Sequence, residues 1–183
     1  MCQALLSDRK FYEHLFRVDR DLADQVRAGG CLRCGERLHS ARYPRKPRGG
    51  AWKLSPDEEM RFSFCCAACR KRRMPGSVRF LGRRVYLGMV VVLASAMSSG
   101  LTDRRVAKLR EHIDVDRRTL ERWRTWWQET FVSTELWIEV RGRLRSPVNE
   151  SELPWSLFEL FGGGMRENLV AMLRFLSPLG SSR

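Results

Sequence analysis

The 183-residue sequence lacks the marks of a secreted or membrane-spanning chain. Residues 1–10, MCQALLSDRK, have no charged amino-terminal region and only a very short apolar stretch, so we expect no signal peptide and a reducing, cytoplasmic setting for the thiols. The uncharged stretch over residues 85–101 has 17 residues with two glycines and three serines. That length is the lower limit for crossing a bilayer, so we expect a buried helix and no membrane partner.

The sequence also has little that would support catalysis. It lacks the alternation of strands and helices that builds a ribonuclease-H-like sheet, on which three carboxylates would converge on two metals. The glycine run at 162–164 is not followed by the Lys-Ser/Thr pair of a phosphate-binding loop and is better explained as a break between helices. We therefore predict that the chain is not an enzyme and has no small-molecule substrate.

Acidic residues are scarce in one part of the chain. The net charge is +13, from 34 basic and 21 acidic residues. Residues 27–84 contain 16 Lys/Arg against 4 Asp/Glu, whereas the remaining stretches are close to neutral. A localised cationic excess favours a polyanion, and nucleic acid is the commonest one in the cytosol.

Four of the six cysteines form two Cys-x2-Cys pairs. The pairs lie in CLRCG (31–35) and CAAC (66–69), and the glycine of the first tolerates the left-handed backbone that follows such a turn. Without an export signal, metal binding is favoured over disulfides. The paired spacing predicts a zinc ribbon with a structural Zn²⁺ and no open coordination position, its ligands being Cys31, Cys34, Cys66 and Cys69.

Two further side chains leave the ligand set open. Cys65 would be the spare thiol, because pairing it with Cys69 needs the less usual Cys-x3-Cys turn. His39 lies eight residues after Cys31 and could replace one thiolate, although an ordinary loop histidine is the simpler interpretation.

Cations follow the second cysteine pair directly. Four thiolates around Zn²⁺ carry a charge of about −2, which the RKRR run at 70–73 can offset. The same run and the breaker-rich loop YPRKPRGG at 43–50 offer groups for phosphate contacts. The candidates are Arg45, Lys46, Arg70, Lys71, Arg72 and Arg73.

Apolar spacing predicts a mainly α protein with a small β-containing zinc ribbon. The stretch 60–64 has the alternation of a strand with Phe62 and Phe64 on one face. Helices are predicted over 8–28, 83–98, 102–112, 117–130, 154–161 and 165–176. We divide the chain into an N-terminal amphipathic helix (1–30), the zinc ribbon (31–80), a helix-turn-helix DNA-binding domain (81–131) and a C-terminal helical region (132–183).

Residues 101–129 have the layout of two helices joined by a short turn. Val106, Leu109 and Ile113 mark the buried stripe of the first helix, and DVD at 114–116 forms the turn and supplies Asp116 as the cap of the second.

The second helix of this pair buries Leu120, Trp123 and Trp127 and turns a cationic row outward. Guanidinium can donate two hydrogen bonds to guanine, so this row predicts reading of the major groove. The alternative is a solvated face on which Glu121 and Glu129 make ion pairs. The candidate contacts are Arg117, Arg118, Thr119, Arg122 and Arg124.

Three segments together resemble a known kind of protein. CLRCGERLHSARYPRKPRGG, RFLGRRVYLG and RRTLERWRTWW look like small bacterial proteins, often linked to mobile elements, that join a zinc ribbon to a transposase-like helix-turn-helix; the likeness covers residues 31–128. Those proteins have a longer interval between their clustered cysteines than CCAAC, which leaves open the choice between Cys65 and Cys66.

The resemblance implies an accessory or regulatory protein that binds double-stranded DNA of the nucleoid in a transposition setting. It admits a separately encoded transposase or recombinase subunit as a partner. Two other classes stay open: a non-catalytic interaction subunit that docks onto a recombinase or polymerase, and an RNA-binding protein whose exposed tryptophans stack on bases.

Overall fold

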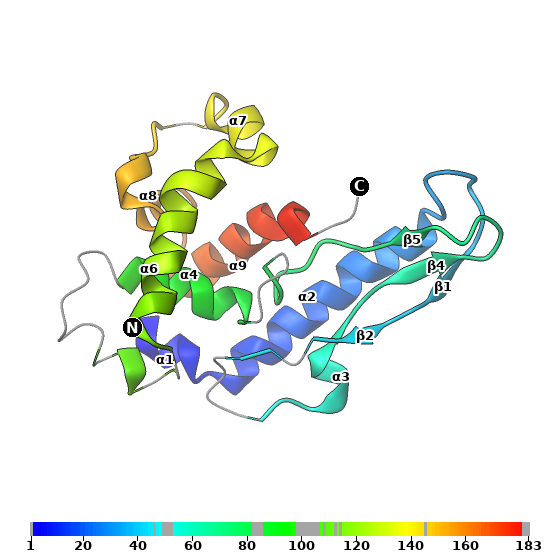
Figure 1. The fold of residues 1–183 in the computed structure, drawn as a ribbon, viewed down its shortest axis with the longest axis horizontal. Helices are drawn as coiled ribbons and strands as arrows, with labels where there is room; N and C mark the ends of the chain where they lie inside the picture. Colours follow the sequence, from blue (N-terminus) through cyan, green and yellow to red (C-terminus); the bar gives the residue numbers. More distant parts are fainter. Residues whose placement is uncertain are drawn as a thin grey trace.

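The computed structural model shows a mainly helical protein with a small antiparallel sheet at one end (Figure 1). Within the part of the chain that it describes, no helix is both long and apolar enough to cross a membrane. The described residues are 2–45, 47–48, 53–81, 86–97, 107, 109–111, 113, 115–144 and 146–180.

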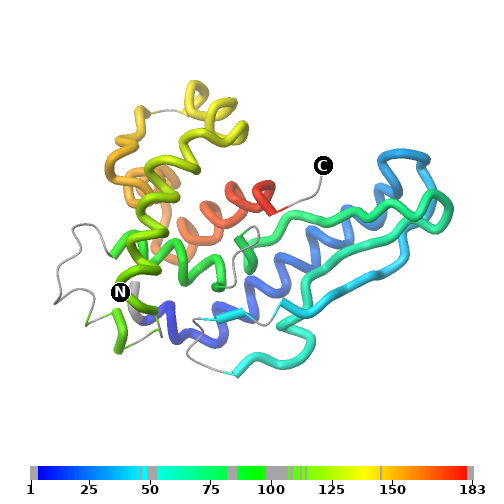
Figure 2. The backbone as a smooth tube through the Cα atoms, viewed as in Figure 1, coloured from blue at the N-terminus to red at the C-terminus, as the bar shows by residue number. Residues whose placement is uncertain are grey.

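Helix α2 (Arg9–Ala28) runs from the helical body to the sheet as one long rod (Figure 2). It begins as predicted, with Asp8 Oδ1 accepting the backbone N–H of Phe11 at 3.0 Å. It ends at Gly29 and Gly30, where Gly30 takes a positive φ of 65°. The short α1 (Cys2–Leu6) precedes it.

The sheet consists of β1 (Leu38–Ser40), β4 (Phe64–Cys66) and β5 (Arg72–Arg73) in the order β1-β4-β5. All pairs are antiparallel, and Leu38 faces Cys66 across the first. A separate two-stranded ladder joins β2 (Tyr43–Pro44) to β3 (Met60–Arg61), just after the short helix α3 (Pro56–Glu59).

The single strand predicted over 60–64 is wrong in detail. Strand structure is interrupted at Phe62 and Ser63, which separate β3 from β4. Phe62 and Phe64 are both buried, but so are the alternating polar residues Arg61 and Ser63, so the stretch does not have one buried and one exposed face. Arg61 can be buried because its guanidinium donates to the carbonyls of Phe80 (3.4 Å), Pro75 (3.0 Å) and Gly180 (2.7 Å).

Two apolar clusters form, and α2 contributes to both. The larger, in the helical body, takes Phe11, Tyr12, Leu15 and Val18 from α2. The smaller lies under the sheet and contains Ala23 of α2 with Cys31, Leu38, Phe62, Phe64 and Cys66. The N-terminal helix is therefore a spine shared by both ends of the molecule.

The helical body follows most of the predicted boundaries. The apolar run forms α4 (Gly88–Met97), which is buried from Gly88 to Ala96. α8 (Trp155–Glu159) and α9 (Met165–Leu176) lie where expected, whereas α7 (Glu135–Arg141) was not predicted.

The helix predicted over 117–130 begins as α6 (Arg117–Thr125) and continues as a π-helix (Trp126–Thr130) and a 3₁₀ turn (Phe131–Ser133). Most of the helix predicted over 102–112 lies outside the described residues. Of it, positions 107, 109 and 110 are helical, and Leu109 and Ile113 are buried as predicted.

A buried ion pair ties α2 to the segment after the sheet. Arg79 Nε lies 2.8 Å from Asp19 Oδ2, with both side chains almost fully buried. The Ser77 hydroxyl donates to the same carboxylate at 2.6 Å, and the backbone N–H of Val78 also donates to it at 2.6 Å. The guanidinium also donates to the carbonyls of Glu58 (2.5 Å) and Met60 (3.0 Å). These hydrogen bonds thus satisfy the buried ion pair with groups of the protein itself.

We expect Arg79→Met to lower the free energy of unfolding by about 3–5 kcal/mol, because Asp19 is left buried without a countercharge. The double variant Asp19→Leu/Arg79→Met should regain part of this loss, since two apolar side chains replace two buried charges. Urea denaturation of the metal-loaded chain measures both. Asp21→Asn, on the exposed side of α2, is the control and should change stability by less than about 0.5 kcal/mol.

Candidate metal centre and cationic surfaces

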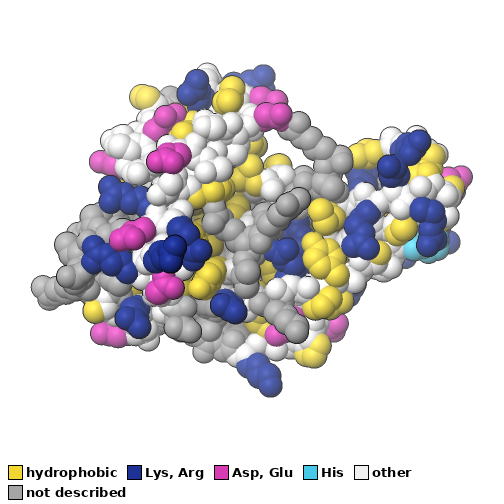
Figure 3. All heavy atoms as spheres, viewed as in Figure 1, with side chains coloured by type: hydrophobic (Ala, Val, Ile, Leu, Met, Phe, Trp, Pro, Cys, Tyr) yellow, Lys and Arg dark blue, Asp and Glu magenta, His cyan; other side chains and the backbone are white. Residues whose placement is uncertain are grey.

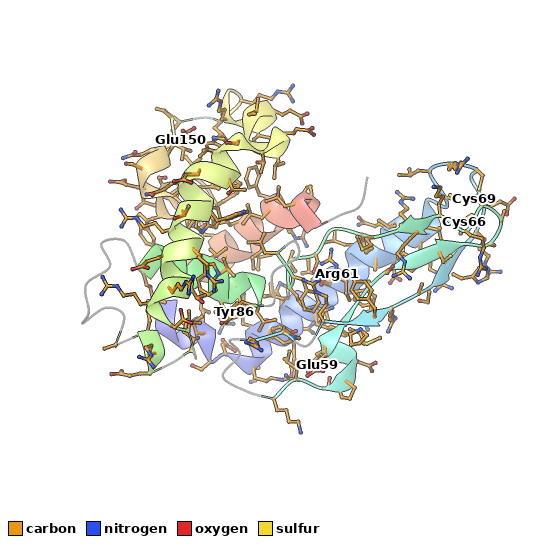
Figure 4. The ribbon with its side chains drawn as sticks, in the orientation of Figure 1. Glu59, Arg61, Cys66, Cys69, Tyr86 and Glu150 are labelled. Atoms are coloured by element: carbon orange, nitrogen blue, oxygen red, sulfur yellow. The ribbon has the colours of Figure 1, made fainter. Side chains whose placement is uncertain are left out.

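Four cysteine sulfurs meet at the end of the sheet farthest from the helical body (Figure 4). The Sγ atoms of Cys31, Cys34, Cys66 and Cys69 all lie within 4.8 Å of one another. Sγ of Cys31 is 3.5 Å from that of Cys69, and Sγ of Cys34 is 3.4 Å from that of Cys66. A tetrahedron with metal–sulfur bonds of about 2.3 Å has sulfur–sulfur edges of about 3.8 Å. The four thiols, which are free of disulfides, therefore match a closed metal site.

The two turns share one backbone design. The N–H of Cys31 donates to Glu36 O at 2.9 Å, and the N–H of Cys66 donates to Lys71 O at 2.9 Å, five residues on in each case. The residue after the second cysteine is left-handed in both turns, with φ of 73° at Gly35 and 60° at Arg70. The first turn uses glycine for this conformation, as predicted, and the second holds an arginine in it.

Backbone N–H groups prepare the thiols for a metal. Those of Arg33 and Cys34 lower the pKa of Cys31 to about 6. Burial opposes ionisation of Cys66, but the N–H of Cys69 and the Cys34 thiol outweigh it and lower its pKa. Although the N–H of Glu36 favours the Cys34 thiolate, the neighbouring thiols raise the pKa of Cys34 to about 12. Full ionisation of such a cluster needs a cation among the sulfurs.

The alternative ligands stand outside this cluster. Cys65 Sγ lies 3.4 Å from the carbonyl oxygen of Arg70, and its side chain takes no place among the four sulfurs. His39 is exposed on β1, opposite Cys65 in the register. The four sulfurs brought together are thus the predicted set. Of the remaining thiols and imidazoles, His14 is exposed on α2, while the Cys2 side chain and His112 are outside the described residues.

The cations around the centre have different environments. Arg70, Lys71 and Arg72 are exposed. Arg73 is half-buried, and its Nη1 donates to the carbonyls of Val26 (3.3 Å) and Gly30 at the end of α2, so it serves the fold. Arg45 is half-buried beside β3, and its backbone N–H donates to Glu59 O at 2.9 Å. Lys46 lies outside the described residues.

Sequence reasoning also missed cations here. Arg33 and Arg37 are exposed on the first turn and the residues after it, next to the exposed Leu32. Their position inside CLRCGERL was the available signal. Conversely, Arg61 and Arg79 belong to the cationic count of residues 27–84, but both are buried and hydrogen-bonded inside the protein. The surface charge there is smaller than the count indicates.

α6 presents a second cationic surface. Asp116 caps it as predicted, with Oδ1 accepting the N–H of Thr119 at 2.6 Å, and this bond lowers the pKa of Asp116. Arg117 makes an exposed ion pair with Glu121 at 3.0 Å, as the solvated-face alternative requires. The exposed arginines are Arg117, Arg118, Arg122 and Arg124.

Thr119 does not belong to the outward row. It is 2% exposed, because it lies one turn before Trp123 and shares the inward face of α6. Its Oγ1 accepts Nη2 of Arg122 at 2.6 Å, so it positions an arginine instead of meeting a ligand.

Cationic side chains over α6 and over the sheet are visible on the same face of the molecule, at opposite ends (Figure 3). The four clustered sulfurs lie beneath the cations at the end of the sheet, and the buried side chains of Leu120, Trp123 and Trp127 lie beneath the cations of α6. Each cationic surface therefore lies over its own cluster of side chains.

Comparisons of this chain with protein-family models, with curated proteins and with solved structures returned no match.

We expect Cys66→Ser to abolish binding of one metal ion per chain, since three thiolates and a hydroxyl hold a thiophilic ion much less tightly. Cys65→Ser is the matched control and should keep the full metal content. Elemental analysis of purified, reduced protein gives both values. Loss of metal from the Cys65 variant and not from the Cys66 variant would reverse the ligand assignment.

We also expect Arg70→Gly to raise the free energy of unfolding by about 0.5–1 kcal/mol, because glycine adopts a positive φ without steric cost. Arg72→Gly, which removes the same charge from β5, should instead lower it by about 0.5–1 kcal/mol. Thermal and urea unfolding of the metal-loaded variants distinguish the two, and a loss of stability in both would contradict the strain assigned to Arg70.

Proposed function

We propose that this chain is a DNA-binding protein in which a structural Zn²⁺ completes a zinc ribbon at the four cysteines. The donor set carries this step: four thiolates suit a zinc ion in a closed site and leave no position for a substrate. When bound, the ion locks two chain turns that the few apolar residues of the small cluster would hold weakly. The metal is therefore structural, and the protein is not an enzyme.

The ribbon grips the DNA backbone. Its exposed cations outnumber its exposed acids, because Arg33, Arg37, Arg70, Lys71 and Arg72 surround the centre and Glu36 alone opposes them among exposed residues 31–40 and 66–73. This excess outweighs the charge of about −2 on a zinc–tetrathiolate group. Such a surface attracts phosphate without regard to sequence.

α6 reads the bases. Three of its exposed arginines, Arg118, Arg122 and Arg124, make no ion pair with any carboxylate of the described residues, and the buried Trp123 anchors the helix. A capped helix with arginines near its amino-terminal end suits the second helix of a helix-turn-helix in the major groove. The single observation that carries the proposal is this pair of cationic surfaces on one face, one beside the four clustered sulfurs and the other on α6.

The biological setting of the proposal comes from the sequence resemblance. It places the protein as an accessory or regulatory factor of a mobile genetic element that acts on nucleoid DNA. Partnership with a transposase or recombinase subunit is part of the same proposal.

Selection of bound duplexes from a random pool with the zinc-loaded full chain tests the proposal, and we expect an enriched motif. Failure to enrich one, together with tight co-purification of a recombinase, favours the interaction subunit. Preferential competition by single-stranded RNA favours the RNA-binding alternative.

The two surfaces should respond differently to substitution. Arg118→Ala should weaken binding to the selected site by about 1–3 kcal/mol and relax preference at one base pair, with little effect on other sequences. The double variant Lys71→Gln/Arg72→Gln should weaken binding to every duplex and reduce the slope of log K against log salt by about 2. Arg143→Ala, an exposed arginine away from both surfaces, is the control. Salt titrations by fluorescence anisotropy measure each; the same response from both variants would remove the division of labour.

A further inference from the structure

A groove lies between α2 and α9, and the proposed DNA surfaces do not use it. Its volume is about 460 Å³, within the range of small-molecule sites. The residues that line it are Phe11, His14, Arg166, Glu167, Val170, Ala171 and Arg174.

The groove has an apolar floor. Phe11 is 2% exposed, and Val170 and Ala171 are half-buried beside it on α9. Arg166 closes one end: its guanidinium pairs with Asp8 at the start of α2 and lies 5.8 Å from the centre of the Phe11 ring. This end is neutral, because the charge of Arg166 already has a carboxylate partner.

The other end is cationic. Arg174 lies two helical turns beyond Arg166 on the same side of α9, and His14 lies one turn beyond Phe11 on α2. Both are exposed, and within the described part of the chain Arg174 has no carboxylate at ion-pair distance. Glu167, the acid of the lining, folds back toward the start of α9: a Cβ built on Gly164 would lie 2.5 Å from its Oε2.

We propose that this groove binds a small carboxylate with an apolar chain, whose carboxylate meets Arg174 and His14 and whose chain covers Phe11, Val170 and Ala171. The floor between Arg166 and Arg174 spans eight residues of helix, or about 12 Å, which is the extended length of a chain of about ten carbons. The guanidinium supplies a charge-assisted, two-bond partner for the anion, and the floor supplies apolar contact along the chain.

Isothermal titration of the zinc-loaded full chain with decanoate, kept below its micelle concentration, tests the site. We expect saturable one-to-one binding with a Kd below about 1 mM. Decyltrimethylammonium, which has the same chain and the opposite charge, should bind at least about tenfold more weakly. Equal binding of the two probes, or none of decanoate, would overturn the proposal.

Two variants locate the ligand. Arg174→Gln should weaken decanoate binding about tenfold while leaving binding to duplex DNA unchanged, and Ala171→Phe should fill the floor and block binding. Arg143→Gln is the matched control for loss of an exposed arginine. Circular dichroism checks the fold of each variant. Unchanged affinity in Arg174→Gln would place the anion elsewhere, and so overturn the site, without touching the proposed DNA binding.

Discussion

The ion pair between Asp19 and Arg79 is the contact on which the rest of the molecule depends, because it joins three parts of the chain at one buried point. Asp19 belongs to α2, Arg79 follows the sheet, and the guanidinium also holds the carbonyls of Glu58 and Met60. The same guanidinium lies 4.7 Å from the ring centres of Phe16 and Phe80. A buried charge of this kind is tolerated only where its partners are complete, so the pair specifies how sheet and helical body meet along α2.

Much of the helical framework was predictable, because it depends on local signals. Asp8 and Asp116 cap their helices, and Leu120, Trp123 and Trp127 fall on one buried face. The four close sulfurs were predictable for a related reason: each Cys-x2-Cys turn is local, and only the meeting of the two turns is long-range. What sequence could not show is which charged residues are internal. Arg61, Arg73 and Arg79 have a type typical of the surface, and their burial depends on carbonyls and carboxylates that lie far away in the chain.

This matters for any inference from net charge. Arginines in residues 27–84 have two roles that composition cannot separate. Some neutralise charges or satisfy hydrogen-bonding groups inside the protein, and others face solvent around the cysteines. Arg73 shows the distinction within four residues, since it satisfies the carbonyl end of α2 while Arg70, Lys71 and Arg72 before it are free to face a ligand. The electrostatic argument for a polyanion therefore rests on the exposed subset and not on the total.

The same architecture bears on how the two cationic surfaces would act together. The cysteine turns contact α2 through Cys31, Ala23 and the carbonyls that Arg73 holds, and the opposite end of α2 packs in the cluster that also buries Trp123 of α6. α2 is a continuous helix of 20 residues with no glycine or proline inside it, so it has no hinge and keeps its two ends at a fixed separation. A duplex that spans both surfaces would have to fit their spacing. Specificity would then depend on the separation of a backbone contact from a base contact as well as on the bases beneath α6.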